Sequence, residues 1–117
     1  MSRKSPITSH VLNTSTGKPA VGMALELTRQ AGDSDRWEQI GATQTDADGR
    51  AGDLLAADGL VAGTYRLKFD TGAYFQRAGE TTFYPSVTVD FQVHSTTEHF
   101  HVPLLISPFG YSTYRGS

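Results

Sequence analysis

The sequence of 117 residues contains no cysteine. This absence excludes disulfide bonds, thiolate nucleophiles and every zinc site that uses cysteine sulfur, and it fits a reducing compartment. The side chains left to carry catalytic chemistry are therefore the histidines, the carboxylates and the arginines.

Long apolar runs and clusters of basic residues are also absent. No run approaches the ~20 apolar residues of a transmembrane helix. The start, MSRKSPITSH, has basic residues but no apolar segment, so it does not resemble a signal peptide. We therefore expect a cytoplasmic protein, with peroxisomal and periplasmic locations left open. The formal net charge of -2 argues against nucleic acid and anionic membranes as partners.

Size and composition predict a single folded domain. A chain of 117 residues is too short for two separate hydrophobic cores, so we assign one domain to residues 1–117. Its 38% hydrophobic and 19% charged residues are typical of a globular protein rather than a disordered one.

Alternating apolar and polar residues predict β-strands along most of the chain. In TYRLKFD, residues 64–70, the side chains of Tyr65, Leu67 and Phe69 fall on one face. SVTVDFQVH, residues 86–94, repeats the pattern. Its inward-facing residues are expected to be Val87, Val89, Phe91 and Val93. Further strands are expected in residues 7–13, 23–29, 37–45, 99–107 and 110–115.

Turn residues separate these strands at short intervals, as in STGKPAVG, QAGDSD and SPFG. Roughly seven to eight short strands joined by such turns predict an all-β protein with an antiparallel β-sandwich. Only residues 71–80, TGAYFQRAGE, favour a helix, which would be short.

Histidines are the principal candidates for catalysis. The tripeptide HFH places His99 and His101 on one face of a strand, because strand side chains alternate with a period of two. The pair could bind zinc with a third ligand such as His10, or one imidazole could act as a general base near neutral pH. A third interpretation is that both are exposed polar residues on a sheet face, and the spacing leaves all three open.

Pro103 lies within the same strand as this histidine pair. Proline cannot donate a backbone hydrogen bond to a neighbouring strand, so it belongs at an edge or a bulge. We therefore expect this strand to lose regular pairing near its own histidines.

The segment TDADGR, residues 45–50, combines aspartates with a glycine. It is too short for an EF-hand calcium loop, so we interpret it as a turn in which Gly49 has a positive φ. The turn places Arg50 at the start of the next segment. There the guanidinium is either a solvated charge or a binding group for a planar, polar substrate.

Motifs for covalent catalysis and nucleotide binding are absent. The sequence has neither a G-x-S-x-G elbow nor a glycine-rich phosphate loop. Ser9 adjoins His10, but the two side chains point to opposite faces if the segment is a strand. Water activated by a base is therefore the favoured nucleophile.

Three stretches carry a resemblance to a known family: SHVLNTSTGKPA in residues 9–20, TQTDADGR in residues 43–50 and HFHVPLLISPFGYSTYRGS in residues 99–117. Together they resemble the 5-hydroxyisourate hydrolases, the enzymatic branch of the transthyretin family, over nearly the whole chain. The terminal Tyr-Arg-Gly-Ser is the signature of this branch. The first two-thirds of the chain also resemble non-catalytic transthyretin-like modules.

The resemblance implies a transthyretin/prealbumin-like sandwich that hydrolyses 5-hydroxyisourate during urate degradation. The implied product is 5-hydroxy-2-oxo-4-ureido-2,5-dihydro-1H-imidazole-5-carboxylate, and no metal or other cofactor is implied. The implied catalytic residues are His10, Arg50 and His101. His10 and Arg50 would also bind the substrate, together with the terminal residues Tyr114, Arg115, Gly116 and Ser117. The resemblance gives His99 no defined role.

The resemblance also implies a homotetramer, a dimer of dimers, with active sites in the channel where the dimers meet. In this interpretation His10 and His101 converge, one removing a proton from water while the other orients the water or protonates the leaving nitrogen. Arg50 would stabilise the oxyanion. A non-catalytic transthyretin-like carrier or interaction module is the alternative, and a three-histidine zinc hydrolase is a third hypothesis.

Overall fold

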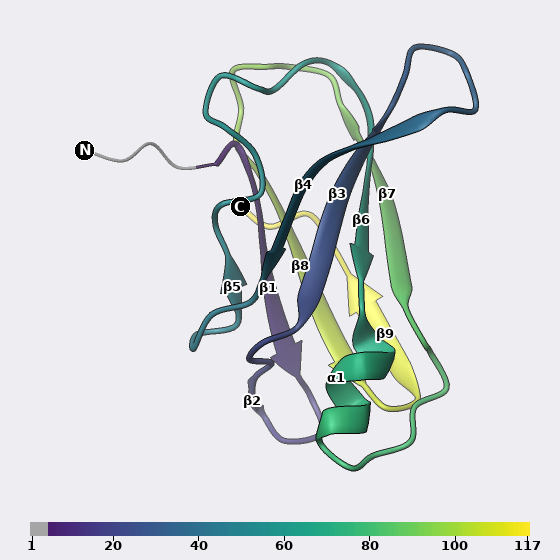
Figure 1. Ribbon diagram of the computed structural model, residues 1–117. Helices are drawn as coiled ribbons and strands as arrows, with labels where there is room; N and C mark the ends of the chain where they lie inside the picture. Colours follow the sequence, from purple (N-terminus) through teal and green to yellow (C-terminus); the bar gives the residue numbers. More distant parts are fainter. Residues whose placement is uncertain (1–4) are drawn as a thin grey trace.

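Two β-sheets pack face to face in the computed structural model, which describes residues 5–117 (Figure 1). One sheet contains β1 (Ile7–Asn13), β2 (Lys18–Pro19), β5 (Arg50–Ala51), β8 (Phe100–Ser107) and β9 (Gly110–Thr113). The other contains β3 (Ala24–Gln30), β4 (Trp37–Gln44), β6 (Gly63–Phe69) and β7 (Val87–Val93). The predicted all-β sandwich is confirmed. Residues 1–4 lie outside the described residues. They belong to the predicted domain and to the start of the chain that was compared with a signal peptide.

The strand order places strands from the two ends of the chain side by side. The first sheet runs β2-β1-β8-β9 with β5 paired to β1, and the second runs β4-β3-β6-β7. One pairing departs from the antiparallel expectation, because β1 and β8 are parallel from Ile7 opposite Phe100 to Asn13 opposite Ile106. The strand that carries His10 therefore lies beside the strand of the HFH motif.

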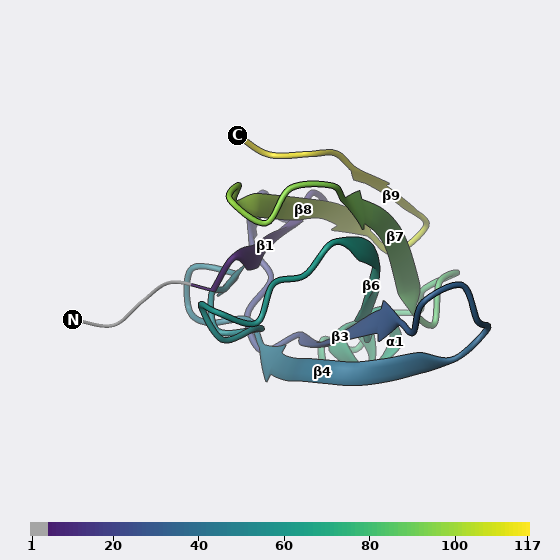
Figure 2. The same ribbon diagram turned by 90° about the horizontal axis from the view of Figure 1, so that it is seen from above.

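The view from above shows the two sheets facing each other (Figure 2), and the buried side chains of the hydrophobic core come from both sheets. The predicted alternation in β6 is confirmed, because Tyr65, Leu67 and Phe69 are each 0% exposed. In β7 the two end valines are buried, whereas Val89 and Phe91 are only partly buried. Val89 and Phe91 line a hollow beside the end of the chain, which leaves them partly exposed.

The predicted helix forms as α1 (Thr71–Arg77) directly after β6. The carboxylate of Asp70 accepts a hydrogen bond from the backbone N–H of Ala73, which caps the helix. Buried Phe75 anchors the helix to the core. No helix within residues 5–117 has the length and apolar character needed to cross a membrane.

Pro103 interrupts the pairing of β8 on one side only. The N–H of Phe100 bonds to Pro6 on the β1 side, and the C=O of His101 bonds to Gly116 on the β9 side. Because backbone groups alternate along a strand, the missing N–H of Pro103 falls on the β9 side. Regular β8–β9 pairing ends at Leu104, whereas the β1–β8 pairing is unbroken. The expected loss of pairing near the histidines is thus confirmed for one edge of β8 and not for the other.

Candidate active site

The outer face of the first sheet brings together polar side chains from β1 and β8. Thr8 of β1 is opposite His101 of β8, and His10 is opposite Pro103. The intervening residue Ser9 is buried and donates a hydrogen bond of 2.7 Å to the carbonyl of Val102. His10 and His101 therefore share one sheet face as diagonal neighbours on adjacent strands.

A turn places Arg50 on the other side of β1. Gly49 has a φ of 76°, as the sequence predicted, and a Cβ at this position would lie 2.6 Å from the carbonyl oxygen of Val11. The Asp46 carboxylate accepts hydrogen bonds from the backbone N–H groups of Arg50 and Asp48. These two bonds, that from Arg50 first, are the main reason why the pKa of Asp46 lies below its usual value. The turn ends in β5.

Strand β5 pairs with β1 so that Arg50 is opposite His10. None of the ion pairs within residues 5–117 involves the Arg50 guanidinium. An exposed arginine without an acidic partner keeps its donor fork available for a ligand.

A pocket of about 360 Å³ opens over these elements. Its polar side chains come from β1, β5, the start of β8 and the end of the chain. They belong to Thr8, Arg50, His99, His101 and Ser117. Ser9 also lines the pocket, but its hydroxyl is already bonded to the carbonyl of Val102. The pocket therefore holds two imidazoles, a guanidinium and the hydroxyls of Thr8 and Ser117, from segments far apart in the sequence.

His101 is the partly buried imidazole of this pocket. Its Nδ1 lies 2.8 Å from Thr8 Oγ1, and the same oxygen lies 2.8 Å from Nε2 of His99. Burial lowers the pKa of His101 below its ordinary value, and the positive charges of His99, His10 and Arg50 lower it further. His101 is therefore neutral at neutral pH, which is the state that a general base requires.

His10 lies at the margin of the pocket and not among its lining residues. Its Nε2 is 2.9 Å from the backbone carbonyl oxygen of Asp48. A carbonyl oxygen only accepts, so Nε2 carries the hydrogen and Nδ1 of the neutral ring keeps a lone pair. His10 can thus accept a hydrogen bond at Nδ1.

The end of the chain is fixed against His101. The N–H of Gly116 donates to the carbonyl of His101 at 2.8 Å, and the two residues form a β-bridge. A Cβ on Gly116 would lie 2.5 Å from Cδ2 of the His101 ring, so only glycine fits there. This contact holds Ser117 at the pocket.

Tyr114 and Arg115 lie outside this pocket. Both line a neighbouring hollow of about 230 Å³ that also contacts His101. Tyr114 is 57% exposed, and the Arg115 guanidinium lies 3.3 Å from Glu98 and 4.8 Å from the ring centre of Phe100. The described chain thus brings Arg50, His101 and Ser117 into one pocket, and it places the other predicted residues at its edges.

Thr8 is the pocket residue that the sequence analysis did not single out. The period of two along its strand places it on the same face as His10, and this was the only available signal. Its contact with both histidines depends on the parallel β1–β8 pairing, which the local pattern does not reveal.

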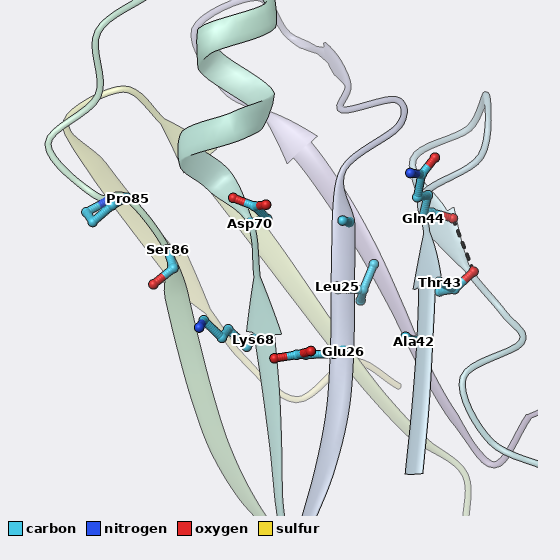
Figure 3. A pocket seen from close by; sticks show the side chains of 10 residues that line it. Leu25, Glu26, Ala42, Thr43, Gln44, Lys68, Asp70, Pro85 and Ser86 are labelled. Carbon is cyan, nitrogen blue, oxygen red and sulfur yellow. Dashed lines mark hydrogen bonds between the residues drawn. The ribbon is translucent and has the colours of Figure 1, made fainter. Parts of the chain in front are cut away.

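A larger hollow of about 630 Å³ lies on the outer face of the second sheet. Figure 3 shows Glu26 beside Lys68, with Asp70 closer to the helix. The hollow has no imidazole among its lining residues, and Asp70 already caps α1. We therefore assign the chemistry to the smaller pocket, which holds a base suited to neutral pH.

The histidines do not form the three-histidine zinc site considered from the sequence. Within residues 5–117, no group of three or more histidines and carboxylates is arranged to hold a metal ion. His10 directs Nε2 to a backbone carbonyl, while His99 and His101 direct nitrogens to the same hydroxyl.

Known proteins resemble this chain over nearly its whole length. Residues 7–116 match the model of the HIUase/Transthyretin family. The 5-hydroxyisourate hydrolase of Mus musculus is 45% identical over 113 residues, which are 97% of this chain and 96% of that protein.

Solved structures agree with this match. The 5-hydroxyisourate hydrolase of Klebsiella pneumoniae superimposes with a TM-score of 0.82 at 38% identity, covering 98% of this chain and 100% of that chain. Sea bream transthyretin in complex with thyroxine gives 0.90 at 34% identity, covering 96% and 95%. The chain therefore belongs to the HIUase/transthyretin family, as its motifs indicated.

Proposed function

We propose that this protein is a 5-hydroxyisourate hydrolase of urate degradation. Support comes from the relatives named 5-hydroxyisourate hydrolase, which are 43–45% identical over most of the chain. The observation that carries the proposal is the pocket in which Arg50 and His101 lie beside the fixed end of the chain.

The proposed reaction opens the six-membered ring of the substrate at an acyl–nitrogen bond and gives the ureido-imidazoline carboxylate named above. Three tasks must be performed: a water molecule loses a proton, the carbonyl oxygen gains negative charge that needs stabilisation, and the leaving nitrogen takes a proton. The pocket offers a group for each task.

His101 acts as the general base. It lines the pocket, and its lowered pKa keeps the imidazole neutral and able to accept the proton of water. A positioned base of this kind contributes about 10²–10⁴-fold to the rate. His10 orients the same water through the lone pair on Nδ1, since its Nε2 is already engaged with Asp48.

Arg50 stabilises the oxyanion. Its guanidinium lines the pocket and has no ion-pair partner within residues 5–117, so its donors can bind the developing charge. A single donor to an oxyanion is typically worth about 10²–10³-fold in rate. Ser117 lines the pocket and is held there by the bond between Gly116 and His101, and Tyr114 and Arg115 complete the binding of the substrate.

We also propose a homotetramer, a dimer of dimers, with the active sites between the dimers. Support comes from an aromatic surface formed by Phe83, Tyr84, Phe109 and Tyr111, in which Phe83 is 72% and Phe109 71% exposed. Exposed aromatic side chains that cluster in this way mark protein interfaces. Tyr114 and Arg115, which the single chain leaves outside the pocket, would approach the substrate in that assembly.

The test couples urate oxidase to this protein and follows the absorbance of the freshly formed 5-hydroxyisourate. We expect the decay to accelerate in proportion to the concentration of the protein. The variants His10→Ala, Arg50→Ala and His101→Ala should each lose most of the acceleration while unfolding at the temperature of the parent. A spontaneous decay rate at every parent concentration would reject the hydrolase and favour the non-catalytic carrier.

A further inference from the structure

We propose that Thr8 carries a proton between His101 and His99, so that the positive charge created by deprotonating water moves from the partly buried imidazole to the exposed one. The proposal rests on the proposed hydrolase function and assigns two further residues to it. Thr8 acts through His101, and it is therefore a positioning and relay residue.

The contacts of the Thr8 hydroxyl carry this inference. Oγ1 lies 2.8 Å from Nδ1 of His101 and 2.8 Å from Nε2 of His99. The ring centroids of the two histidines are 6.5 Å apart with planes inclined by 23°, so the hydroxyl is the shared partner that connects them. Both distances are those of a well-formed hydrogen bond.

The position of this hydroxyl is fixed by the strand that carries it. The neighbours of Thr8 in β1, Ile7 and Ser9, are 0% and 1% exposed, and Ser9 is bonded to the backbone of β8. Thr8 itself is opposite His101 in the β1–β8 register. The backbone therefore holds the hydroxyl between the two rings.

A hydroxyl group has a single hydrogen to donate, and this couples the two neutral rings. If Nδ1 of His101 donates to Thr8, then Thr8 donates to Nε2 of His99. In that arrangement Nε2 of His101 has a lone pair and can act as the base. The reverse arrangement would place a hydrogen on Nε2 of His101 and would remove the base from the pocket.

The forward step moves three protons and creates two opposite charges, an imidazolium on His99 and an oxyanion on the substrate. Water gives a proton to Nε2 of His101, the Nδ1 proton moves to Thr8 Oγ1, and the original Thr8 hydroxyl proton moves to Nε2 of His99. The hydroxide oxygen uses its electron pair to bond to the substrate carbonyl carbon, and the π-electron pair of the C=O bond moves onto the carbonyl oxygen, which becomes the oxyanion. His101 ends neutral, the Thr8 hydroxyl is restored, and His99 becomes an imidazolium.

The return step restores the resting state. The acyl–nitrogen bond breaks, and the leaving nitrogen takes the Nε2 proton of His101. The Thr8 hydroxyl proton then returns to Nδ1 of His101, and the Nε2 proton of His99 returns to Thr8. The new carboxylic acid loses its proton to solvent, so the protein is unchanged over the cycle.

Burial favours the imidazolium at His99 over one at His101. His99 is exposed, whereas His101 is partly buried, and burial is the main cause that lowers the pKa of His101. His99 shares the pocket with Arg50, and its sequence neighbour Glu98 pairs with Arg115 at 3.3 Å. A charge that leaves His101 therefore becomes better solvated.

The kinetic test uses Thr8→Val, Thr8→Ser and His99→Gln in the coupled assay. We expect Thr8→Val and His99→Gln each to lower kcat about 10- to 100-fold, a part of the total effect of the base. Thr8→Ser, which keeps the hydroxyl, should stay within a few-fold of the parent. The double variant Thr8→Val/His99→Gln should lose no more than either single variant, because residues that act as a unit are not additive.

Thr28→Val is the matched control. Thr28 is a half-buried threonine on β3 of the other sheet, and its hydroxyl has only a 3.5 Å contact with a backbone carbonyl. Its variant should keep the parent rate. If Thr8→Val is as active as Thr28→Val, or if His99→Gln keeps the parent rate, the relay is rejected although the hydrolase function stands. A parent without activity rejects the function itself.

A second measurement does not depend on activity. Nitrogen-15 NMR of the histidine side chains distinguishes the two neutral tautomers of each ring. We expect the hydrogen of resting His101 to be on Nδ1 in the parent, and we expect this preference to be lost in Thr8→Val. Finding the hydrogen on Nε2 of His101 in the resting parent would overturn the proposal.

Discussion

His101 contributes to the stability of the protein in a way that depends on pH. Burial, followed by the charges of His99, His10 and Arg50, lowers its pKa in the folded state below the ordinary 6.5. Below pH 6.5 the unfolded chain therefore binds this proton more readily than the folded chain. By linkage, the free energy of unfolding must fall as the pH falls from 6.5 toward the lowered pKa.

His101→Gln removes this titration and keeps a polar side chain. We expect acidification from neutral pH through about pH 5 to reduce the denaturant midpoint of the parent more than that of the variant. The other titrating groups are common to both proteins, so their contributions cancel in the comparison. Equal losses of stability in the two proteins would show that burial does not disfavour the charged form of His101.

Gly116 illustrates how a residue without a side chain can belong to an active site. A Cβ at this position would lie 2.5 Å from Cδ2 and 3.2 Å from Cγ of His101. Gly116→Ala should therefore turn the ring or detach the chain terminus, and we expect kcat/KM to fall at least about tenfold because the base is misplaced.

The matched control for this substitution is Gly110→Ala, since a Cβ at Gly110 meets only Ser107 Oγ at 3.7 Å. This variant should keep the parent activity. Both proteins should unfold at nearly the same temperature, because the exposed terminus contributes little to the core. A fully active Gly116→Ala would mean that the terminus does not position His101.

At the scale of elements, the turn that ends in β5 determines the position of Arg50. Gly49→Ala combines a left-handed backbone at φ 76° with a contact of 2.6 Å to the carbonyl of Val11. We expect the free energy of unfolding to fall by about 2–4 kcal/mol. Activity should fall as well, because β5 carries Arg50 against His10.

Gly17→Ala separates the cost of the left-handed backbone from the cost of the close contact with Val11. Gly17 has a similar φ of 73°, but a Cβ there would meet nothing within 4 Å. Its cost is the backbone conformation alone, about 1–2 kcal/mol, and its activity should be unchanged. Urea titration measures both variants. If Gly49→Ala were no more destabilised than Gly17→Ala, the close packing of the turn on β1 would be disproved.

Strand faces could be predicted from the sequence because they depend only on local alternation. The shared face of His99 and His101 and the buried face of β6 both follow from the period of two. The parallel neighbour of β8 could not be predicted, since pairing between chain segments 93 residues apart is a non-local choice. The Thr8 contact with both histidines was missed for the same reason.

The end of the chain could be predicted only in part from the sequence. The terminal signature indicated that these residues belong to a site. The strand expected over 110–115, however, ends at Thr113, because Pro103 has no backbone N–H to donate to β9. The chain then returns to β8 only at Gly116. Ser117 consequently reaches the pocket, while Tyr114 and Arg115 line the neighbouring hollow.

At the scale of the whole molecule, the fold does not distinguish an enzyme from a carrier. Superposition gives TM-scores of 0.82 with a 5-hydroxyisourate hydrolase and 0.90 with a transthyretin bound to thyroxine. One sandwich therefore serves both kinds of protein, and the function must be argued from the pocket.

The aromatic surface tests the proposed tetramer. Phe83 and Phe109 are adjacent because the N–H of Phe83 bonds to the carbonyl of Pro108, and both rings are more than 70% exposed. Burying such rings at an interface is favourable by about 25 cal/mol per Å² of apolar surface. Phe83→Ser and Phe109→Ser should each shift the sedimentation of the protein from tetramer toward dimer or monomer at micromolar concentration.

The control is Val61→Ser, because Val61 is 46% exposed and precedes β6, outside the aromatic surface. That surface comes instead from the segment between α1 and β7, from the turn that follows β8 and from β9. This variant should sediment as the parent does. The two phenylalanine variants should also lose activity in step with the tetramer, because Tyr114 and Arg115 would then lack the second dimer across the channel. A parent that sediments as a fully active monomer would contradict the assembly, and it would require Tyr114 and Arg115 to bind substrate within a single chain or not at all.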